Sequence, residues 1–403
     1  MTRHIRSADI RGVSRLVVDA TIGLASLVET MHHNILRTPG ILGKPTQQPA
    51  RGITGFVYKS IRGVTRLVGG GIDAVLERLV PFFSGAASSQ EREAVLAALN
   101  GVLGDHLQAG ANPLAIAMQL RRDGRALELN RAALAAAIPA ATGKVLLLVH
   151  GLCMNDLQWR RNGHDHGAAL AADAGLTPVY LHYNSGLHIS TNGRAFAGQI
   201  EALLQAWPVH VDELAILAHS MGGLVARSAC HYGELAQHDW LRHLRKLVFL
   251  GTPHHGAALE RGGNWVDLLL DASPYTTAFA RLGKIRSAGI TDLRHGSMVD
   301  GDWEDRDRFV RSRHKQVEVP LPQNVVCHAI AASIAKRRGK LVERLLGDGL
   351  VSVASALGED PRGRSNLALP KRRQWIGYGM NHMDLLDRSE VYARIKRWLQ
   401  PGS

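Results

Sequence analysis

Short apolar runs alternate with helical patterns from about residue 110 onward, and this alternation constrains the fold more than any other feature. A β-hairpin comes first, because alternating apolar residues up to Leu120 precede an Asp-Gly turn at 123–124 and a returning strand at 127–129. Apolar runs suited to buried strands then follow at 145–149, 178–182, 214–217, 247–250, 325–331 and 375–378. Helical patterns lie between them, notably at 194–207 and 222–230. The pattern predicts an α/β fold with a doubly wound, mostly parallel sheet.

The loops that follow the strands are where such sheets place their chemistry. Directly after the run at 214–217 comes A-H-S-M-G-G at 218–223, which leads into a helical pattern. A serine on a tight turn between strand and helix projects its hydroxyl over the sheet, and small neighbours permit the strained backbone. The usual pattern is G-x-S-x-G, and Ala218 replaces its first glycine. Ser220 is therefore a candidate nucleophile.

Three further segments accompany the serine in a recognisable order. The run at 145–149 ends in H-G-L at 150–152, G-D-G-L-V-S occupies 347–352, and G-M-N-H-M-D occupies 379–384. A serine hydroxyl needs a base to remove its proton, and that base needs a carboxylate to fix its tautomer. Asp348 and His382 supply these two groups downstream of Ser220.

These segments resemble the α/β-hydrolase superfamily over roughly residues 110–400, and the serine turn resembles the A-H-S-M-G elbow of small bacterial lipases. Bacterial triacylglycerol lipases and the lipase-like domain of GPI inositol-deacylases are the nearest families in character. The resemblance implies a Ser220, Asp348 and His382 triad. It also implies that the backbone N-H groups of Leu152 and Met221 hold the developing oxyanion.

The same resemblance places several residues beside the substrate. His150, Gly151 and His219 flank the two motifs, and His254 lies in G-T-P-H-H-G at 251–256, a loop that shapes the pocket in lipases. Two plainer interpretations stay open: His150 as a simple strand-end histidine, and His254 with its neighbour His255 as structural residues.

Other candidates for the acid and for a metal are weaker. Asp384 lies two residues from His382 and is better interpreted as a turn or cap group, and Asp302 lies in a polar insertion. His164, Asp165 and His166 have His182 nearby in the strand at 178–182, but their spacing fits no zinc template, so a solvated helix start is the favoured interpretation. No phosphate-binding or dinucleotide motif occurs. We expect neither metal nor cofactor.

An insertion at 256–313 interrupts the alternation after the sixth strand. Its apolar residues are Trp265, Val266, Leu268, Leu269, Leu270, Tyr275, Phe279 and Leu282. Insertions at this point form caps or lids in the superfamily, and apolar residues there would line an acyl pocket. Plain core packing is the alternative.

Residues 1–105 form a separate helical segment ahead of a catalytic domain at 106–403. I-R-G-V-S-R-L-V at 10–17 recurs as I-R-G-V-T-R-L-V at 61–68, and apolar residues in both copies follow helical spacing. A third helix is predicted from Ser89 to about Leu103. The segment is either a helical cap on the catalytic domain or an amphipathic element that binds anionic lipid.

The composition indicates which partners and which cellular location to expect for the chain. Lys and Arg number 48 against 35 acidic residues, but the basic runs are dispersed and lack interleaved aromatics, so nucleic-acid binding is not expected. The 3 cysteines are Cys153, Cys230 and Cys327, which show no CxxC spacing and are read as reduced, packed thiols. No signal peptide or membrane-spanning run is evident. We expect a cytoplasmic protein, with peripheral membrane or lipid-surface contact through the N-terminal helices.

Taken together, the residues predict a serine hydrolase that cleaves a carboxylic ester of a small molecule or lipid through an acyl-enzyme. One alternative is an intracellular polyester depolymerase or a phospholipase that works at a lipid surface. A second is a non-catalytic lipid-binding protein on a hydrolase fold, which the intact triad argues against.

Overall fold

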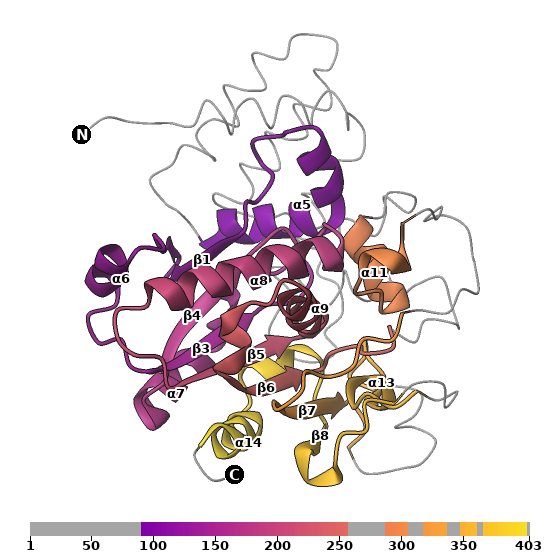
Figure 1. The fold of residues 1–403 in the computed structure, drawn as a ribbon. Helices are drawn as coiled ribbons and strands as arrows, with labels where there is room; N and C mark the ends of the chain where they lie inside the picture. The colour runs from indigo at the N-terminus through magenta and orange to yellow at the C-terminus, as the bar shows by residue number, and fades with distance from the viewer. Residues whose placement is uncertain (1–89, 257–286, 305–316, 337–346, 361–365, 401–403) are drawn as a thin grey trace, which may run out of the picture.

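The computed structural model describes residues 90–256, 287–304, 317–336, 347–360 and 366–400, and these contain one eight-stranded sheet (Figure 1). The strand order is β2-β1-β4-β3-β5-β6-β7-β8. The strands are β1 Gln119–Arg122, β2 Arg125–Ala126, β3 Lys144–Val149, β4 Thr177–His182, β5 Glu213–His219, β6 Leu244–Leu250, β7 Val326–Ser333 and β8 Gln374–Tyr378. Strand β1 pairs antiparallel with β2 and β4, and the other neighbours are parallel. The predicted doubly wound, mostly parallel sheet is confirmed.

The opening hairpin is shorter than the alternation predicts. Its turn is as expected, because Asp123 and Gly124 both have positive φ, at 49° and 73°, as a tight two-residue hairpin turn requires. The alternating residues before β1 do not join the sheet. The Asn100 amide instead donates to the Leu114 carbonyl at 2.8 Å and accepts from the Ile116 N-H at 2.8 Å. A side chain therefore satisfies the backbone groups that a longer strand would have paired.

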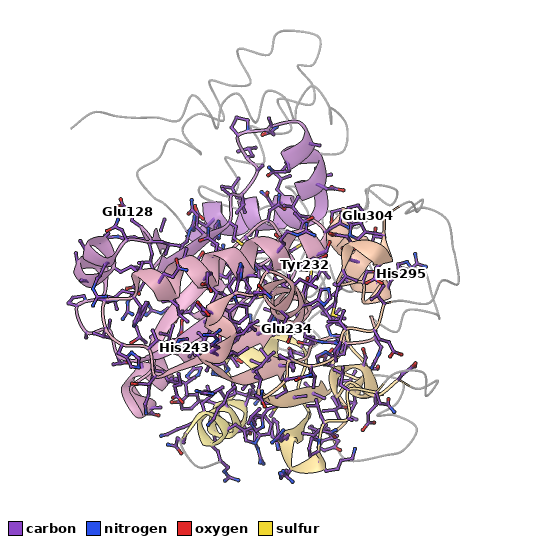
Figure 2. All side chains as sticks on the ribbon, in the orientation of Figure 1. Glu128, Tyr232, Glu234, His243, His295 and Glu304 are labelled. Atoms are coloured by element: carbon purple, nitrogen blue, oxygen red, sulfur yellow. The ribbon has the colours of Figure 1, made fainter. Side chains whose placement is uncertain are left out.

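Helices cover both faces of the sheet (Figures 1 and 2). The helices are α5 Gln90–Ala109, α6 Arg131–Ala137, α7 His166–Ala174, α8 Ile189–Ala206, α9 Met221–Leu235, α11 Ala288–His295, α13 Val353–Ala356 and α14 Ser389–Leu399. Apolar residues of α5, α8 and α9 share one buried core with one face of the sheet. Residues of α7 and α14 form a second core on the other face. A Cβ on Gly193 of α8 would lie 2.2 Å from the Ser228 Oγ of α9, so glycine permits their close packing.

Helix α5 is the predicted third helix of the N-terminal segment, and it belongs to the body of the molecule. Leu99, Leu103 and Leu107 are buried in the core that α8 and α9 share with the sheet. The expected boundary at 105/106 falls inside this helix. The repeat at 10–17 and 61–68 lies outside the described residues, as do 257–286 and 305–316 of the expected lid.

The described part of the insertion, residues 287–304, packs against α8. The His188 ring at the start of α8 stacks on Trp303 with centroids 3.7 Å apart, and its Nδ1 lies 3.0 Å from Asp292 Oδ2 in α11. Within the described ranges, none of the helices is both long enough and apolar enough to cross a bilayer.

Candidate active site

Ser220 occupies the single residue between β5 and α9, in a strained conformation. Its φ is 54° and its ψ is −127°, in a region that residues with a Cβ seldom occupy. Such a conformation costs about 1–3 kcal/mol and persists only where its surroundings enforce it. Here the Ser220 N-H donates to the Leu250 carbonyl at the end of β6, at 2.8 Å. The neighbouring strand thus holds the turn in place.

The small residues of the turn are needed for close backbone approach. A Cβ on Gly222 would lie 2.4 Å from the Val149 carbonyl oxygen, and one on Gly223 would lie 2.0 Å from Thr252 Oγ1. A side chain at either position would push α9 away from β3 and β6. Ala218, in place of the usual first glycine, is fully buried within β5. The methyl group of alanine is therefore accommodated there.

Asp348 and His382, which come from the loops after β7 and β8, form a short hydrogen bond. The His382 Nδ1 donates to Asp348 Oδ2 at 2.6 Å, and both side chains are buried. The other carboxylate oxygen accepts from the N-H groups of Leu350 at 2.9 Å and Val351 at 2.8 Å. Because the carboxylate accepts at Nδ1, the neutral ring presents its lone pair at Nε2. The pair can therefore act as an oriented base.

Backbone and ring contacts bring His382 against the turn that carries Ser220. His219, the residue before Ser220, lies with its ring centroid 4.7 Å from that of His382 and its Nε2 3.3 Å from the His382 carbonyl oxygen. The His382 Nε2 is buried and makes no hydrogen bond to a described residue. Hydrogen bonds between nucleophile and base are often long without substrate and tighten in the reacting complex.

Gly251, at the end of β6, makes room for the imidazole. Its φ is 59°, and a Cβ there would lie 3.0 Å from His382 Cε1 and 2.8 Å from Leu385 Cδ1. The motif at 251–256 marked this loop as part of the pocket, and the structure adds that its first glycine contacts the ring.

The two expected oxyanion donors come from segments that meet at Ser220. A Cβ on Gly151 would lie 3.0 Å from the Ser220 Cβ, so the loop after β3 passes directly beside the serine. Met221 is the first residue of α9, where N-H groups have no partner inside the helix. Neither the Leu152 nor the Met221 N-H donates to another described residue. Their role as oxyanion donors stays a prediction.

The three histidines assigned to substrate contact are buried and engaged with the protein. His150 stacks on Tyr183 with centroids 4.3 Å apart, and burial lowers its pKa to about 3. Burial and the neighbouring His382 lower the pKa of His219. Burial and the Arg227 guanidinium, 3.3 Å from His254 Nδ1, lower the pKa of His254. All three rings are therefore neutral near pH 7, and their contact with substrate stays a prediction.

The rival acids have structural partners. Asp384 Oδ2 accepts from the Asn381 N-H at 2.9 Å, which is the local turn role expected of it. Asp302 accepts from the N-H groups of Met298 at 2.8 Å and Val317 at 2.9 Å. Neither carboxylate is directed at His382.

The histidines near residue 165 form a helix start, as expected. Asp165 caps α7 by accepting from the Ala168 N-H at 3.0 Å. His166 is buried rather than solvated, because its Nε2 lies 3.0 Å from the Leu385 carbonyl oxygen. His182 pairs elsewhere, with Asp156. The described residues contain no group of three or more His, Cys, Asp or Glu side chains placed to hold a metal ion. The three cysteines are free and buried, as predicted.

A buried ion-pair cluster that sequence reasoning missed lies beside the loop after β3. Asp156 contacts His182 Nδ1 at 3.0 Å and Arg121 Nη1 at 3.3 Å, and Arg121 also contacts Glu93 of α5 at 3.0 Å. Burial opposes the shift, but the contact with His182 and the charges of His182 and Arg121 lower the pKa of Asp156. These charged residues are present in the sequence, but their spacing gives no indication that they lie close together in the fold.

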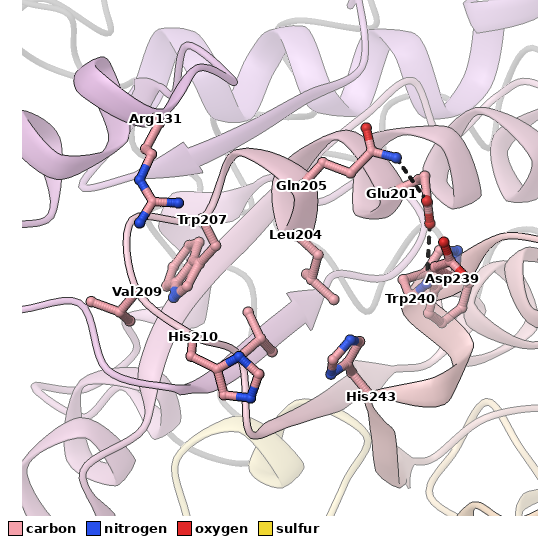
Figure 3. A pocket seen from close by; sticks show the side chains of 11 residues that line it. Arg131, Glu201, Leu204, Gln205, Trp207, Val209, His210, Asp239, Trp240 and His243 are labelled. Atoms are coloured by element: carbon pink, nitrogen blue, oxygen red, sulfur yellow. Dashed lines mark hydrogen bonds between the residues drawn. The ribbon is translucent and has the colours of Figure 1, made fainter.

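A cavity of about 490 Å³ lies at the opposite end of the parallel strands, beside the amino ends of β5 and β6 (Figure 3). Its lining includes Glu201, Trp207, Trp240 and His243. None of the predicted site residues lines it. The cavity is therefore separate from the group around Ser220.

Comparisons with known proteins identify a family model that matches part of the chain. The model of the family described as PGAP1-like alpha/beta domain matches residues 140–325. No curated protein matches the chain.

Among solved structures, the mature lipase BlEst2 of Bacillus licheniformis is similar, with 16% identity, a TM-score of 0.42, and coverage of 70% of this chain and 98% of that one. Lipase B of Aspergillus fumigatus has 15% identity and a TM-score of 0.40, and covers 95% of this chain and 83% of its own. The esterase Pf2001 of Pyrococcus furiosus has 12% identity and a TM-score of 0.37, with coverage of 64% and 81%.

The strand order, the turn at Ser220 and the family match confirm the resemblance drawn from the sequence. The chain therefore has an α/β-hydrolase fold, within which residues 140–325 are similar to the PGAP1-like alpha/beta domain.

Proposed function

We propose that the chain is a serine hydrolase that cleaves carboxylic esters through an acyl-enzyme. The observation that carries the proposal is the 2.6 Å hydrogen bond between His382 and Asp348, formed beside the strained turn that presents Ser220. A buried, oriented imidazole next to a serine on such a turn is the arrangement that nucleophilic acyl transfer requires.

In the proposed reaction the His382 Nε2 takes the Ser220 hydroxyl proton as Oγ attacks the ester carbonyl. The negative charge that develops on the carbonyl oxygen is held by the N-H groups of Leu152 and Met221. His382 then gives its proton to the leaving alcohol, and the acyl group stays on Ser220. A water molecule, activated by the same imidazole, releases the acid and restores the serine.

The residues divide this work by their surroundings. Asp348 is buried and accepts two backbone N-H bonds, which fix the position of the carboxyl group that orients His382 and would stabilise the imidazolium. The oxyanion donors are fixed backbone dipoles, and each contributes about 3–4 kcal/mol to the transition state in enzymes of this kind. Gly151 passes beside Ser220 and would border the substrate together with His219, while His150 packs against Tyr183 and His254 against Arg227.

The proposed substrate is a lipid or another acyl ester. Its acyl chain would run between the loops after the strands and the insertion at 256–313, for which the sequence predicts an apolar lid. The basic, amphipathic repeat in the first 89 residues would hold the enzyme at a lipid surface.

Ser220→Ala tests the proposal directly. We expect hydrolysis of p-nitrophenyl acyl esters to fall by at least about 10³-fold, and labelling by a fluorophosphonate probe to disappear, because the variant lacks the proposed nucleophile. Circular dichroism and thermal unfolding should stay native, since alanine removes one oxygen from the site. Ser389→Ala, at an exposed position in α14, is the matched control and should label normally. Unchanged turnover by Ser220→Ala would refute the nucleophile.

A panel of p-nitrophenyl esters with acyl chains of increasing length tests the substrate class. Activity that rises from short to long chains and increases on emulsions would support a lipid ester. A maximum at two to four carbons would contradict the lipid assignment and leave the serine mechanism intact.

A further inference from the structure

Helix α5 lies directly against the loop that carries the Leu152 N-H. A Cβ on Gly101 would lie 2.2 Å from the Cys153 Sγ and 2.9 Å from its Cα. The Cys153 Sγ also lies 3.8 Å from the Ala98 carbonyl oxygen of the same helix. The backbone of α5 therefore contacts Cys153 directly, because Gly101 has no side chain. Cys153 is the residue next to the proposed oxyanion donor.

Cys153 is held in a conformation that its own chain does not favour. Its φ is 59°, in the left-handed region, and its side chain is buried. The Cys153 N-H donates to Ser185 Oγ at 3.0 Å, and α5 closes the other side. Contacts from two directions fix the backbone immediately after Leu152.

The far end of the same loop is tied to α5 by charge. Glu93 of α5 contacts Arg121 at 3.0 Å, and Arg121 contacts Asp156 at 3.3 Å. The side chains of Arg121 and Asp156 are 14% and 2% exposed, so solvent screens this pairing less than it would at the surface. Asp156 lies in the short helical turn Asp156–Trp159 that ends the loop. The segment 151–156 thus touches α5 at Cys153 and is linked to it at Asp156 through Arg121 of β1.

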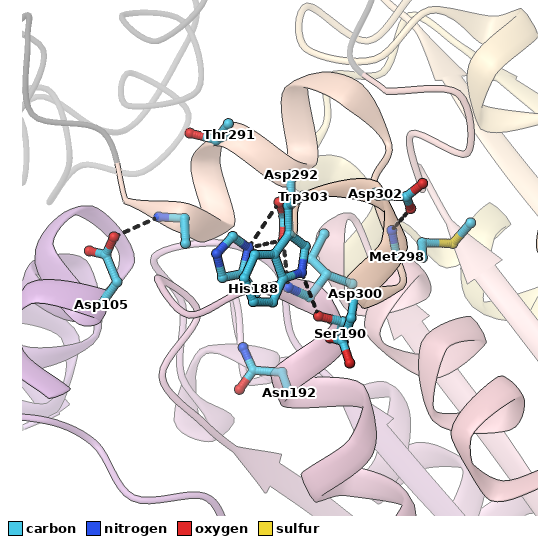
Figure 4. Close-up of polar contacts among 12 residues, drawn as sticks. Asp105, His188, Ser190, Asn192, Thr291, Asp292, Met298, Asp300, Asp302 and Trp303 are labelled. Carbon is cyan, nitrogen blue, oxygen red and sulfur yellow. Dashed lines mark hydrogen bonds and ion pairs between the residues drawn. The ribbon is translucent and has the colours of Figure 1, made fainter. Parts of the chain in front are cut away.

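Helix α5 is itself anchored to the surrounding loops, so its position is defined. The Asn184 side chain donates to the Gly104 carbonyl at 3.0 Å, and a Cβ on Gly186 would lie 2.1 Å from the Asn100 carbonyl oxygen. At the start of α11, the Ala288 N-H donates to Asp105 at 3.0 Å (Figure 4). Two further segments, residues 184–186 and the start of α11, therefore contact the helix that Cys153 touches.

We propose that α5 positions the oxyanion hole. It holds segment 151–156 at two positions, directly through Gly101 against Cys153 and indirectly through the Glu93–Arg121–Asp156 ion pairs, and thereby directs the Leu152 N-H at the developing oxyanion. The inference rests on the proposed function. A backbone donor stabilises the transition state only when it lies within about 0.5 Å of the correct place. A displacement of about 1 Å is enough to lower the rate about 10²-fold. Gly101 and Glu93 are accordingly positioning residues.

Gly101→Ala is the first test. Its methyl group must displace the loop or the helix, so we expect kcat to fall about 100-fold while KM changes by less than about threefold. The inhibition constant of an aryl boronic acid, whose tetrahedral adduct uses the same donors, should rise by a similar factor. Rates are expressed per site that reacts with a fluorophosphonate, so a loss of folded protein does not count. Gly198→Ala, in α8 with no atom within 4 Å of the new methyl, is the matched control and should match wild type.

A second substitution tests whether the contact itself is responsible. Cys153→Gly removes the thiol that the new methyl meets and suits the left-handed backbone at that position. In the double variant with Gly101→Ala we expect at least about a tenfold recovery of kcat. No recovery would overturn the contact between the new methyl group and the Cys153 thiol as the cause.

Glu93→Gln tests the other end of the loop and is decisive if Gly101→Ala does not fold. We expect a threefold to tenfold loss of kcat, again without a matching change in KM. The role of α5 would be overturned if both Glu93→Gln and Gly101→Ala kept the wild-type kcat per reactive site. If only Glu93→Gln folds, a wild-type kcat in that variant alone would overturn it. A wild-type protein that neither hydrolyses esters nor reacts with the probe would overturn the proposed function as well.

Discussion

Polar groups at the two ends of the parallel strands differ in how completely they are hydrogen-bonded. At the carboxyl end, beside Ser220, several buried atoms make no hydrogen bond to a described residue: His150 Nε2, His219 Nδ1, Thr252 Oγ1, His254 Nε2 and His382 Nε2. At the amino end, polar groups of Trp207 and Thr142 make hydrogen bonds. The Trp207 Nε1 donates to the Thr142 carbonyl at 2.9 Å, and the Thr142 hydroxyl reaches the Gly175 carbonyl at 2.9 Å and the Thr177 hydroxyl at 3.0 Å.

This difference indicates that the carboxyl end contributes mainly to activity and the amino end mainly to stability. A buried polar group without a partner costs about 1–3 kcal/mol, so a cluster of them is unfavourable for folding. Strain at Ser220 adds to that cost at the same end. At the amino end, by contrast, the hydrogen bonds of Trp207 and Thr142 stabilise the sheet. Conservative changes at the carboxyl end should therefore affect activity far more than stability, and those at the amino end should do the reverse.

Asp348→Asn should produce the largest effect. The asparagine oxygen can still accept from Leu350 and Val351, but its amide would face His382 Nδ1 with a donor. The ring would then present its N-H to Ser220, so we expect kcat to fall about 10³- to 10⁴-fold. Ester hydrolysis measured per folded molecule checks this, and the free energy of unfolding should change by less than about 1 kcal/mol.

Asp384→Asn is the control for that experiment, because Asp384 bonds within its own turn. It should keep kcat within about twofold. If it lowered kcat as much as Asp348→Asn, the assignment of the acid would be wrong.

Thr142→Val should show the opposite signature at the amino end. The change keeps the shape of the side chain and removes the hydroxyl that bonds to Gly175 and Thr177. We expect the free energy of unfolding to fall by about 1–2 kcal/mol, measured by urea denaturation, with kcat and KM unchanged. A loss of kcat beyond about twofold would contradict the separation of the two ends.

The sequence predicted the parts of this comparison that depend on local pattern. The apolar runs at 145–149 and 214–217 became β3 and β5, and the motifs placed Ser220 at the end of one of them. Asp348 and His382 were predicted as a pair from motif order, and the structure brings them within hydrogen-bond distance.

The contacts of α5 were not predicted, for a physical reason. Hydrophobic periodicity reports which face of a helix is buried, whereas Gly101 and Gly104 act through the absence of a side chain. A glycine in a helical pattern looks only like a weak position. Likewise, the cluster of Glu93, Arg121, Asp156 and His182 joins four segments whose proximity exists only in the folded sheet.

His328 is an exception at the amino end of the strands. It is a buried residue near the amino end of β7, and its two ring nitrogens make no hydrogen bond to a described residue. Burial, with smaller effects from Arg373 and Lys246, lowers its pKa from 6.5 to about 4. Below pH 6.5 the unfolded chain therefore binds a proton that the folded chain does not. The contribution of this residue to stability falls as pH falls from about 6.5 toward 4, by up to about 1.4 kcal/mol per pH unit.

His328→Phe should remove this acid sensitivity and keep the stacking on Trp398, whose ring centroid lies 4.4 Å away. Between pH 7 and pH 5 we expect the variant to lose about 2 kcal/mol less unfolding free energy than wild type, measured by urea denaturation at each pH. His210→Gln, at a position that is 86% exposed, is the control and should follow wild type. Ester hydrolysis at pH 7 should be unchanged in both variants. Equal losses in His328→Phe and wild type would show that the folded ring is protonated at pH 5, and that this end of the sheet also tolerates a buried charge.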